Sequence, residues 1–306
     1  MINSGYFYAL AATFFWSFNI IIASYFADTL TPWEIAFGRW VVAAVILGIA
    51  AWKGLKENFS LLLKNRWLVL WLALTGIVLD NTLIYYAGRT ASAVDMGLLD
   101  VTGPIFLVIL SRIFLKTPIS GKQIAGLAIA VFGVIVIILN GDLTQITRFN
   151  FVSGDLWMLA NTFCFAVYSL LQSKRPAQIS QTVMLAATAI VGVAVIAPVL
   201  AVTVSETQLL NLNMEEIEVM IYLGLFNSVL SYLAWNTALN KIGNVKTGII
   251  YYLLPIFSGI EAYYMLGEQI NAAEVYGGIL VIGGIALVSM QKHPKKIFAK
   301  KQPRVG

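Results

Sequence analysis

The sequence predicts an all-α polytopic membrane protein in which ten transmembrane helices form two inverted five-helix repeats. Three observations lead to this fold class: the apolar composition, an internal repeat and the placement of the basic residues. Hydrophobic residues make up 59% of the 306 residues and charged residues 11%, whereas soluble domains contain about 25% charged residues. With a mean hydropathy of +0.82, so apolar a chain is expected to lie in a lipid bilayer.

The second half of the chain repeats the first. Residues 87–133 align without a gap on residues 238–284, and Pro-Ile-Phe at 104–106 recurs at 255–257. Paired glycines recur at the same spacing, with Gly126 and Gly133 matching Gly277 and Gly284. An internal duplication of this kind is typical of transporters built from two related halves. We therefore expect one repeat over residues 1–145, a second over residues 150–291, and a basic cytoplasmic tail over residues 292–306.

Ten segments are long and apolar enough for a spanning helix, which needs about 20 residues. In order, they are 5–26, 32–51, 67–87, 92–114, 120–140, 153–173, 180–203, 218–239, 244–266 and 272–291. Short joints with helix breakers or charges separate them, such as Thr31-Pro32, Lys116-Thr117-Pro118 and Lys174-Arg175-Pro176. The first apolar run has no basic segment before it and leads directly into the second, so we expect no cleavable signal peptide.

The basic residues orient these spans. Of the 20 Lys and Arg residues, all but Arg39, Arg89 and Arg148 fall on the cytoplasmic side if the N-terminus is cytoplasmic. The positive-inside rule therefore predicts that both termini are cytoplasmic. We expect the protein in a bacterial inner (plasma) membrane. Because each repeat has five spans, the second repeat enters the membrane inverted, which suits alternating access. Topology and anionic lipid account for the basic tail, so no nucleic-acid partner is expected.

Several segments resemble the EamA branch of the drug/metabolite transporter superfamily. They are Ala11–Asn19 in the first span, Thr31-Pro32 through Arg39 in the second, Pro104-Ile105-Phe106 in the fourth, and Pro255-Ile256-Phe257 followed by Leu266-Gly267-Glu268 in the ninth. The resemblance implies a basket of ten helices whose spans 1, 3, 4, 6, 8 and 9 line a central cavity, with spans 5 and 10 peripheral. It also implies transport of small metabolites, often amino acids or amphipathic drugs and usually outward.

Acidic residues inside the expected spans are candidates for function. Asp80, Asp100 and Glu261 lie within spans, and Asp95 lies at the entrance of the fourth. A charge at mid-bilayer costs about 2.5–3.5 kcal/mol on insertion scales, so such groups face a cavity, pair with another charge or bind protons. We interpret Asp80, Asp100 and Glu261 as candidates for proton coupling or for binding a cationic group. A structural ion pair is the alternative.

Arg39 is the one basic residue deep within an expected span. A structural role is favoured, with Glu34 or Asp100 as its ion-pair partner, and a substrate carboxylate is the alternative ligand. The remaining predicted substrate-binding residues are polar or aromatic: Trp16, Asn19, Tyr85, Tyr168, Asn227, Tyr232, Trp235 and Tyr252. Aromatic rings together with acids suit an ammonium group through cation–π contacts, whereas interfacial anchoring is the alternative role for such rings.

Pro104 and Pro255 occupy matching places in the two repeats. Each removes a backbone donor and bends its helix, so we predict gating hinges there, with static kinks as the alternative. The chain has no phosphate-binding loop of the type Gly-x-x-x-x-Gly-Lys-Ser/Thr, so we expect transport driven by a gradient or by exchange. Its one histidine, His293, follows Lys292, and its one cysteine is Cys164. We therefore expect no enzyme, metal or cofactor.

The predicted function is a secondary active transporter for small metabolites. Amino acids or related compounds are the preferred substrates and export the preferred direction, with proton coupling or exchange. The alternative is a transporter of organic cations such as quaternary amines, and the competing classes are a membrane-embedded enzyme and a channel. The predicted partners are the small-molecule substrate and the lipid bilayer, with the chain as a monomer or a homodimer.

Overall fold

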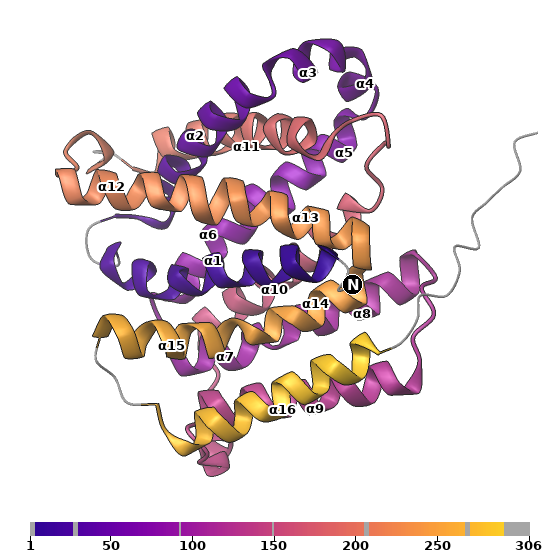
Figure 1. Ribbon diagram of the computed structural model, residues 1–306. Helices are drawn as coiled ribbons and strands as arrows, with labels where there is room; N and C mark the ends of the chain where they lie inside the picture. The colour runs from indigo at the N-terminus through magenta and orange to yellow at the C-terminus, as the bar shows by residue number, and fades with distance from the viewer. Residues whose placement is uncertain are drawn as a thin grey trace, which may run out of the picture.

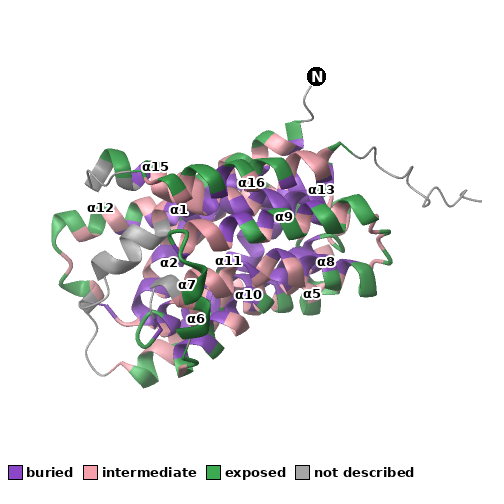
Figure 2. Cartoon of the chain, turned by 90° about the horizontal axis from the view of Figure 1, so that it is seen from below, coloured by how far each residue is buried: buried purple, intermediate pink, exposed green. Residues whose placement is uncertain are grey.

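All regular secondary structure in the described part of the chain is helical. The computed structural model describes residues 4–26, 30–91, 93–148, 150–204, 208–266 and 270–290, and none of these residues forms a strand. Long helices run roughly side by side, with α2 and α11 at one edge and α9 and α16 at the other (Figure 1). Buried residues follow the middle of this bundle and exposed ones its rim (Figure 2).

The helical elements follow the expected spans closely. They are α1 (Ser4–Phe26), α2 (Pro32–Ala50), α3 (Trp52–Glu57), α4 (Phe59–Lys64), α5 (Arg66–Ala73), η1 (Leu74–Leu79), α6 (Asp80–Ala87), α7 (Ala93–Asp100), α8 (Thr102–Phe114), α9 (Gly121–Ile138), η2 (Leu143–Arg148), α10 (Ser153–Gln172), α11 (Gln181–Thr203), η3 (Gln208–Leu210), α12 (Met214–Tyr222), η4 (Leu223–Leu230), α13 (Ser231–Ile242), α14 (Asn244–Ile250), η5 (Tyr251–Leu253), α15 (Leu254–Leu266) and α16 (Ala272–Ser289).

Eight helices in the described part of the chain are long and apolar enough to cross a membrane. They are Pro32–Ala50, Arg66–Ala87, Asp95–Phe114, Gly121–Ile138, Ser153–Gln172, Gln181–Thr203, Met214–Ile242 and Ala272–Ser289. The other two expected spans, 5–26 and 244–266, are also helical, as α1 and as α14, η5 and α15. The expected all-α fold is therefore confirmed, and the count of ten spans stays a prediction.

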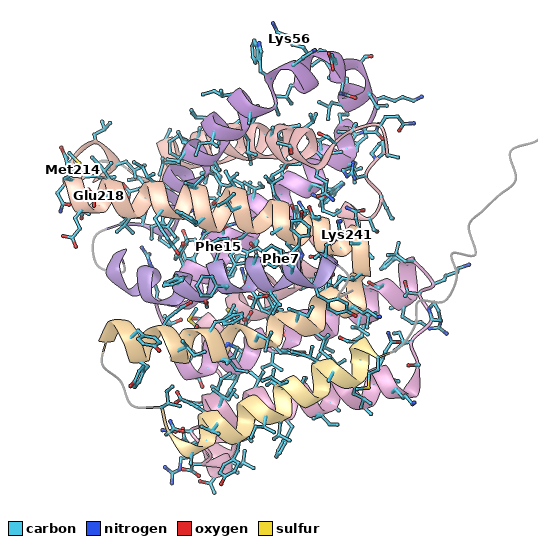
Figure 3. All side chains as sticks on the ribbon, in the orientation of Figure 1. Phe7, Phe15, Lys56, Met214, Glu218 and Lys241 are labelled. Carbon is cyan, nitrogen blue, oxygen red and sulfur yellow. The ribbon has the colours of Figure 1, made fainter. Side chains whose placement is uncertain are left out.

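The surface of the bundle is apolar, as lipid requires. Large side chains such as Val45, Ile49 and Ile279 are more than half exposed. Figure 3 shows side chains projecting around the whole bundle, with Lys241 at one end of the α12–α13 segment and Glu218 at the other. An exterior that combines exposed aliphatic groups with charges at helix ends is characteristic of an integral membrane protein.

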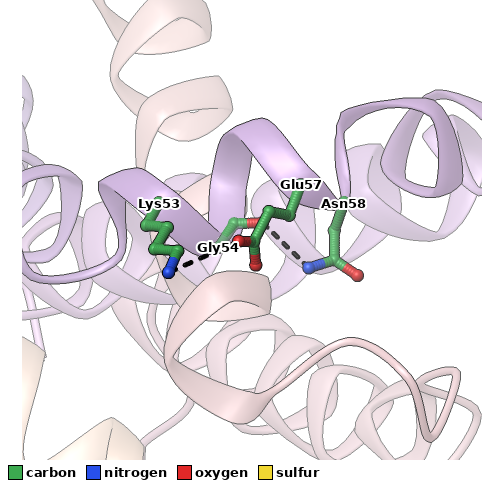
Figure 4. Close-up of polar contacts among 4 residues, drawn as sticks. All are labelled: Lys53, Gly54, Glu57 and Asn58. Atoms are coloured by element: carbon green, nitrogen blue, oxygen red, sulfur yellow. Dashed lines mark hydrogen bonds and ion pairs between the residues drawn. The ribbon is translucent and has the colours of Figure 1, made fainter.

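The expected cytoplasmic loop after the second span is itself helical. It forms α3 and α4, where Lys53 and Glu57 make an i,i+4 ion pair of 3.9 Å and the Asn58 side chain donates to the Gly54 carbonyl at 2.9 Å (Figure 4). The ammonium of Lys56 also lies 4.4 Å from the Trp52 ring centroid. Such i,i+4 contacts stabilise a helix that hydropathy alone does not detect.

The eighth expected span is longer than the sequence suggested. We expected residues 218–239, whereas the helix runs from Met214 to Ile242. Asn213 begins it with a capping box, in which its side chain accepts from the Glu216 amide and the Glu216 side chain accepts from the Asn213 amide. Gly243 ends it with φ of 80°, a conformation that favours glycine.

The helices α9 and α16 cross at glycines, and their contacts are reciprocal (Figure 1). A methyl group added at Gly126 would lie 2.7 Å from the Gly284 carbonyl oxygen, and one added at Gly133 would lie 2.7 Å from the Gly277 carbonyl oxygen. The internal repeat matches Gly126 with Gly277 and Gly133 with Gly284. Exchanging the two halves therefore exchanges these two contacts.

Two segments of π-helix also occupy matching places. η1 precedes Asp80 and η4 precedes Ser231, and the i+5 pattern of each leaves a carbonyl for a side chain. The Asn81 amide donates to the Gly76 carbonyl at 3.0 Å, and the Ser231 hydroxyl donates to the Phe226 carbonyl at 2.7 Å. In both halves, a polar side chain thus binds a carbonyl five residues earlier.

Candidate functional site

A central cavity of about 500 Å³ lies between the two halves. Side chains from α1, α2, α6, α7, α8, α10, α13 and the α14–α15 segment line it. The resemblance implied these spans with the exception of the second, which contributes Arg39. The lining extends to Gly88 and Arg89, which are exposed just beyond α6, so the cavity reaches the surface at that end.

Asp80 lies on the cavity wall directly after the π-helical segment η1. The Tyr232 hydroxyl donates to its Oδ2 at 2.9 Å, and the Asn81 amide donates to the same oxygen at 3.2 Å. The Asn161 amide donates to Oδ1 at 3.2 Å and also to the Asp80 carbonyl. Neutral donors from three helices therefore hold this carboxylate in place.

Asp100, the last residue of α7, also lines the cavity. The Tyr251 hydroxyl is a polar neighbour of its carboxylate, and the two residues occupy matching positions in the two repeats. Other matching pairs also meet: the Asn81 amide donates to the Tyr232 hydroxyl at 3.1 Å over a separation of 151 residues. The cavity thus lies where equivalent positions of the two halves approach one another.

Arg39 is 2% exposed and nevertheless lines the cavity. Its Nε donates to the Ser228 hydroxyl at 3.0 Å and its Nη1 to the Tyr85 hydroxyl at 3.3 Å. The expected ion pair with Glu34 or Asp100 does not form within 4.0 Å in the described residues. Instead, the Glu34 carboxylate accepts hydrogen bonds from the Thr31 amide and from the Thr31 hydroxyl. These bonds cap the N-terminus of α2.

Aromatic rings form one wall of the cavity. They are Trp16, Phe165, Tyr232, Trp235 and Tyr251. The Trp16 ring is central, with centroid distances of 5.3 Å to Phe165, 5.6 Å to Tyr232 and 5.4 Å to Trp235. Its indole nitrogen donates to the Asn227 carbonyl at 3.0 Å, which fixes the ring. This wall presents π faces and edges to any group that enters.

Some predicted binding residues lie behind this wall or away from it. Tyr168 is fully buried, accepts from Asn236 at 2.8 Å and from Gln172 at 3.0 Å, and does not line the cavity. Tyr252 is also buried and donates to the Val101 carbonyl at 2.8 Å. Asn227 is fully buried as well.

Glu261 and Asn19 were also predicted from the sequence. The Glu261 carboxylate is 5% exposed, accepts a hydrogen bond from the Ser17 hydroxyl between α15 and α1, and does not line the cavity. The Asn19 side chain lies outside the described residues. Of the two predicted hinges, Pro104 lines the cavity in the first turn of α8, and Pro255 is the second residue of α15.

Sequence reasoning missed Asn161 and Thr162, which lie on the cavity from α10. The Thr162 hydroxyl is 3.1 Å from that of Thr102. Two adjacent polar side chains in an apolar span, such as Asn161 and Thr162, indicate a face that lines a cavity. The internal repeat instead predicted Tyr168 as the binding residue of this span. Repeat matching therefore led to a tyrosine that is buried and does not line the cavity.

The family follows from comparison with known proteins. A family model described as the EamA-like transporter family matches residues 3–139 and 152–290. The chain belongs to the EamA-like transporter family. It is therefore a transporter of the drug/metabolite superfamily and an integral membrane protein, and the expected resemblance is confirmed.

Relatives of this EamA-like transporter cover most of its length. A Bacillus subtilis protein named "Uncharacterized transporter YyaM" is 28% identical over 94% of this chain and 94% of its own. A Streptantibioticus cattleyicolor protein named "Probable terminal-alkyne amino-acid exporter" is 26% identical over 83% of each chain. One solved crystal structure shares the fold, with a TM-score of 0.75 and 19% identity over 94% of this chain and 96% of that one.

Proposed function

We propose that this EamA-like transporter is a secondary carrier that exports small amine-bearing metabolites, foremost amino acids, by alternating access with proton coupling or exchange. The central cavity carries this proposal, because it places two carboxylates beside an aromatic wall between the two halves. Carboxylates attract an ammonium group, and aromatic faces bind it by cation–π contacts. The name of the Streptantibioticus relative, an amino-acid exporter, supports the same substrate class.

An inverted repeat of ten spans is part of this proposal. The glycine contacts between α9 and α16 exchange when the halves exchange, and matching residues such as Asn81 and Tyr232 meet. Reciprocal contacts of this kind are those of a two-fold axis, and a two-fold axis in the membrane plane inverts one half. Lys246 supports placing both termini on one side, because it lies 5.9 Å from the Tyr6 ring and donates to the Ser289 carbonyl.

The two ends of the cavity support an outward-facing state. The cavity reaches the surface beside Arg89, and the distribution of basic residues along the sequence supports assigning this end to the outside. Toward the end of α10, the Trp235 indole donates to the Ser169 hydroxyl at 2.9 Å, and α13 closes on α10 there. In alternating access, the contacts between α13 and α10 at the closed, cytoplasmic end break, and equivalent contacts form at the outer end.

Counterflow in proteoliposomes tests carrier function. Vesicles that contain the wild-type protein are preloaded with unlabelled leucine or phenylalanine and given the radiolabelled form outside. We expect a transient accumulation of label, because a carrier returns with either molecule bound. A channel or an enzyme gives no accumulation, so simple equilibration of label for every amino acid in a full panel would overturn the proposal.

Asp80→Asn tests the role of the cavity carboxylate. We expect counterflow to fall by roughly tenfold or more, because a hydrogen bond to a charged group is stronger than one to a neutral amide. Asp142→Asn is the matched control, since Asp142 is exposed in the connection after α9. Equal counterflow in the two variants would remove Asp80 from the proposed site.

Counterflow in proteoliposomes also distinguishes amino acids from the alternative substrate class, organic cations. The aromatic wall around Trp16 is the feature that favours organic cations, because a quaternary ammonium binds π faces without hydrogen bonds. If choline drives counterflow of labelled amine and amino acids do not, the carrier is one for organic cations.

A further inference from the structure

Arg39 makes no direct ion pair in the described part of the chain. Its two hydrogen-bond partners, Ser228 and Tyr85, are neutral hydroxyls, and no carboxylate of the described residues lies within 4.0 Å. Its other terminal nitrogen, Nη2, has no hydrogen-bond partner in the described part of the chain and is not fully buried. Because Arg39 lines the cavity, Nη2 faces it. Removing an unpaired charge from water is costly, so a ligand charge is the expected complement.

The cavity keeps its opposite charges apart. Asp80 lies on the same cavity and within electrostatic range of Arg39, yet its oxygens are bound by the neutral groups of Tyr232, Asn81 and Asn161. Asp100 likewise has a neutral hydroxyl, that of Tyr251, as a polar neighbour. Direct pairing of the guanidinium with a carboxylate would satisfy both charges, and the described residues show no such pair. Neutral partners on both charges leave each one available to a ligand.

We propose that Arg39 and Tyr85 form a carboxylate-binding subsite of the central cavity, positioned by Ser228. The site then selects zwitterions, with the ligand carboxylate on Arg39 and the ligand ammonium on the aspartate side. This inference rests on the proposed function, in which the same cavity binds the substrate. It makes the substrate an amino acid or a close analogue and disfavours amines without a carboxylate.

The donors of this subsite suit a carboxylate. A guanidinium offers five N–H donors in a planar fork, of which Ser228 and Tyr85 occupy two. The remaining donors match the two oxygens of a carboxylate. Because the Tyr85 oxygen accepts from Arg39, its own hydrogen is directed away from the guanidinium and is available to the ligand.

Binding of matched ligand pairs tests the subsite. L-Leucine is compared with 3-methylbutylamine, and L-phenylalanine with 2-phenylethylamine, by calorimetry on the purified full-length protein. Each amine is its amino acid without the carboxylate. For the wild type, we expect the amino acid to bind at least about tenfold more tightly than its amine, as for a hydrogen-bonded charged group.

Variants assign this preference to Arg39. In Arg39→Gln, we expect the preference to disappear through weaker amino-acid binding, with amine binding unchanged, and in Arg39→Lys to return in part. Tyr85→Phe tests the subsite if Arg39→Gln does not fold, and we expect it to lower the preference roughly threefold or more. Arg112→Gln, at an exposed position in α8, is the matched control.

The outcomes separate this inference from the proposed function. If amino acids drive counterflow but bind no more tightly than their amines, or if Tyr85→Phe and both Arg39 variants keep the preference, the carboxylate subsite is wrong and the carrier function stands. If neither ligand class binds and no amino acid drives counterflow, the subsite and the proposed function are both wrong. A preference that is lost in Arg39→Gln and kept in Arg112→Gln supports both.

Discussion

Two intramembrane carboxyl groups, Asp80 and Glu261, have different surroundings. Asp80 lies on the cavity and accepts hydrogen bonds at both oxygens. Glu261 lies off the cavity, with one oxygen bound to Ser17 and the other, Oε2, buried without a hydrogen-bond partner in the described residues. A buried carboxylate oxygen without a donor costs roughly 1–3 kcal/mol or more, and protonation lowers this cost because it removes the buried charge. The two acids therefore suit different roles, ligand binding and proton binding.

Glu261→Gln is expected to weaken the dependence of transport on pH, because a neutral amide cannot exchange a proton. Counterflow and net uptake are measured across a pH series in wild type and variant. Tyr222, the titratable neighbour of Glu261 on α12, is replaced by Phe in parallel to exclude its contribution. Glu218→Gln is the exposed control. An unchanged pH profile in Glu261→Gln would exclude Glu261 from proton coupling.

At the scale of elements, close backbone contact joins the two halves at α9 and α16. Glycines permit this approach because they have no side chain at the crossing. A methyl group at Gly284 would lie 2.4 Å from the Gly126 carbonyl oxygen and 2.8 Å from the Ala130 amide nitrogen. The adjacent Gly283 has no atom within 4 Å of such a methyl group. Two neighbouring glycines of one helix therefore differ in their tolerance of a side chain.

Gly284→Ala is expected to destabilise the protein by about 1–3 kcal/mol, as overpacking does. Gly283→Ala is the control, and we expect equal or slightly higher stability because alanine favours helix over glycine. The melting temperatures of both purified variants are compared with that of the wild type. Equal melting temperatures for the two variants would show that the crossing is looser than the structure indicates.

The whole molecule is organised by contacts between equivalent positions. Asn81 meets Tyr232, Asp100 meets Tyr251, and the cavity lies among these pairs. An inverted repeat has a direct topological consequence: corresponding connections of the two repeats lie on opposite sides of the membrane. The connection after the second span of each repeat contains Lys53 and Leu210, and both residues are exposed.

Thiol labelling tests this inversion. Cys164 is replaced by serine, and single cysteines are introduced as Lys53→Cys and Leu210→Cys. In intact cells, we expect a membrane-impermeant maleimide to label the cysteine at position 210 and to label that at position 53 only after permeabilisation. Labelling of both from the same side would contradict the inverted arrangement.

Periodicity and hydropathy predicted most helices within a few residues, because spanning lipid imposes length and apolarity on each segment separately. They missed α3 and α4, which side-chain contacts stabilise, and the π-helical segments, which depend on partners such as Asn81 for the freed carbonyls. Polar or aromatic character predicted Asp80, Asp100, Tyr85 and Trp235, which line the cavity. It did not distinguish them from Tyr168, because both kinds of residue lie on the same inward helix faces.

By itself, the sequence determined the membrane environment, the helical class, the duplication and the family, because each depends on composition or on order along the chain. The tertiary structure alone decided that Arg39 binds hydroxyls rather than Glu34 or Asp100, and that Glu261 lies apart from the cavity. These outcomes depend on the relative rotation and depth of helices far apart in the chain. Packing sets that rotation and depth, so an inward-facing charge in the sequence acquires its partner only when the two halves meet.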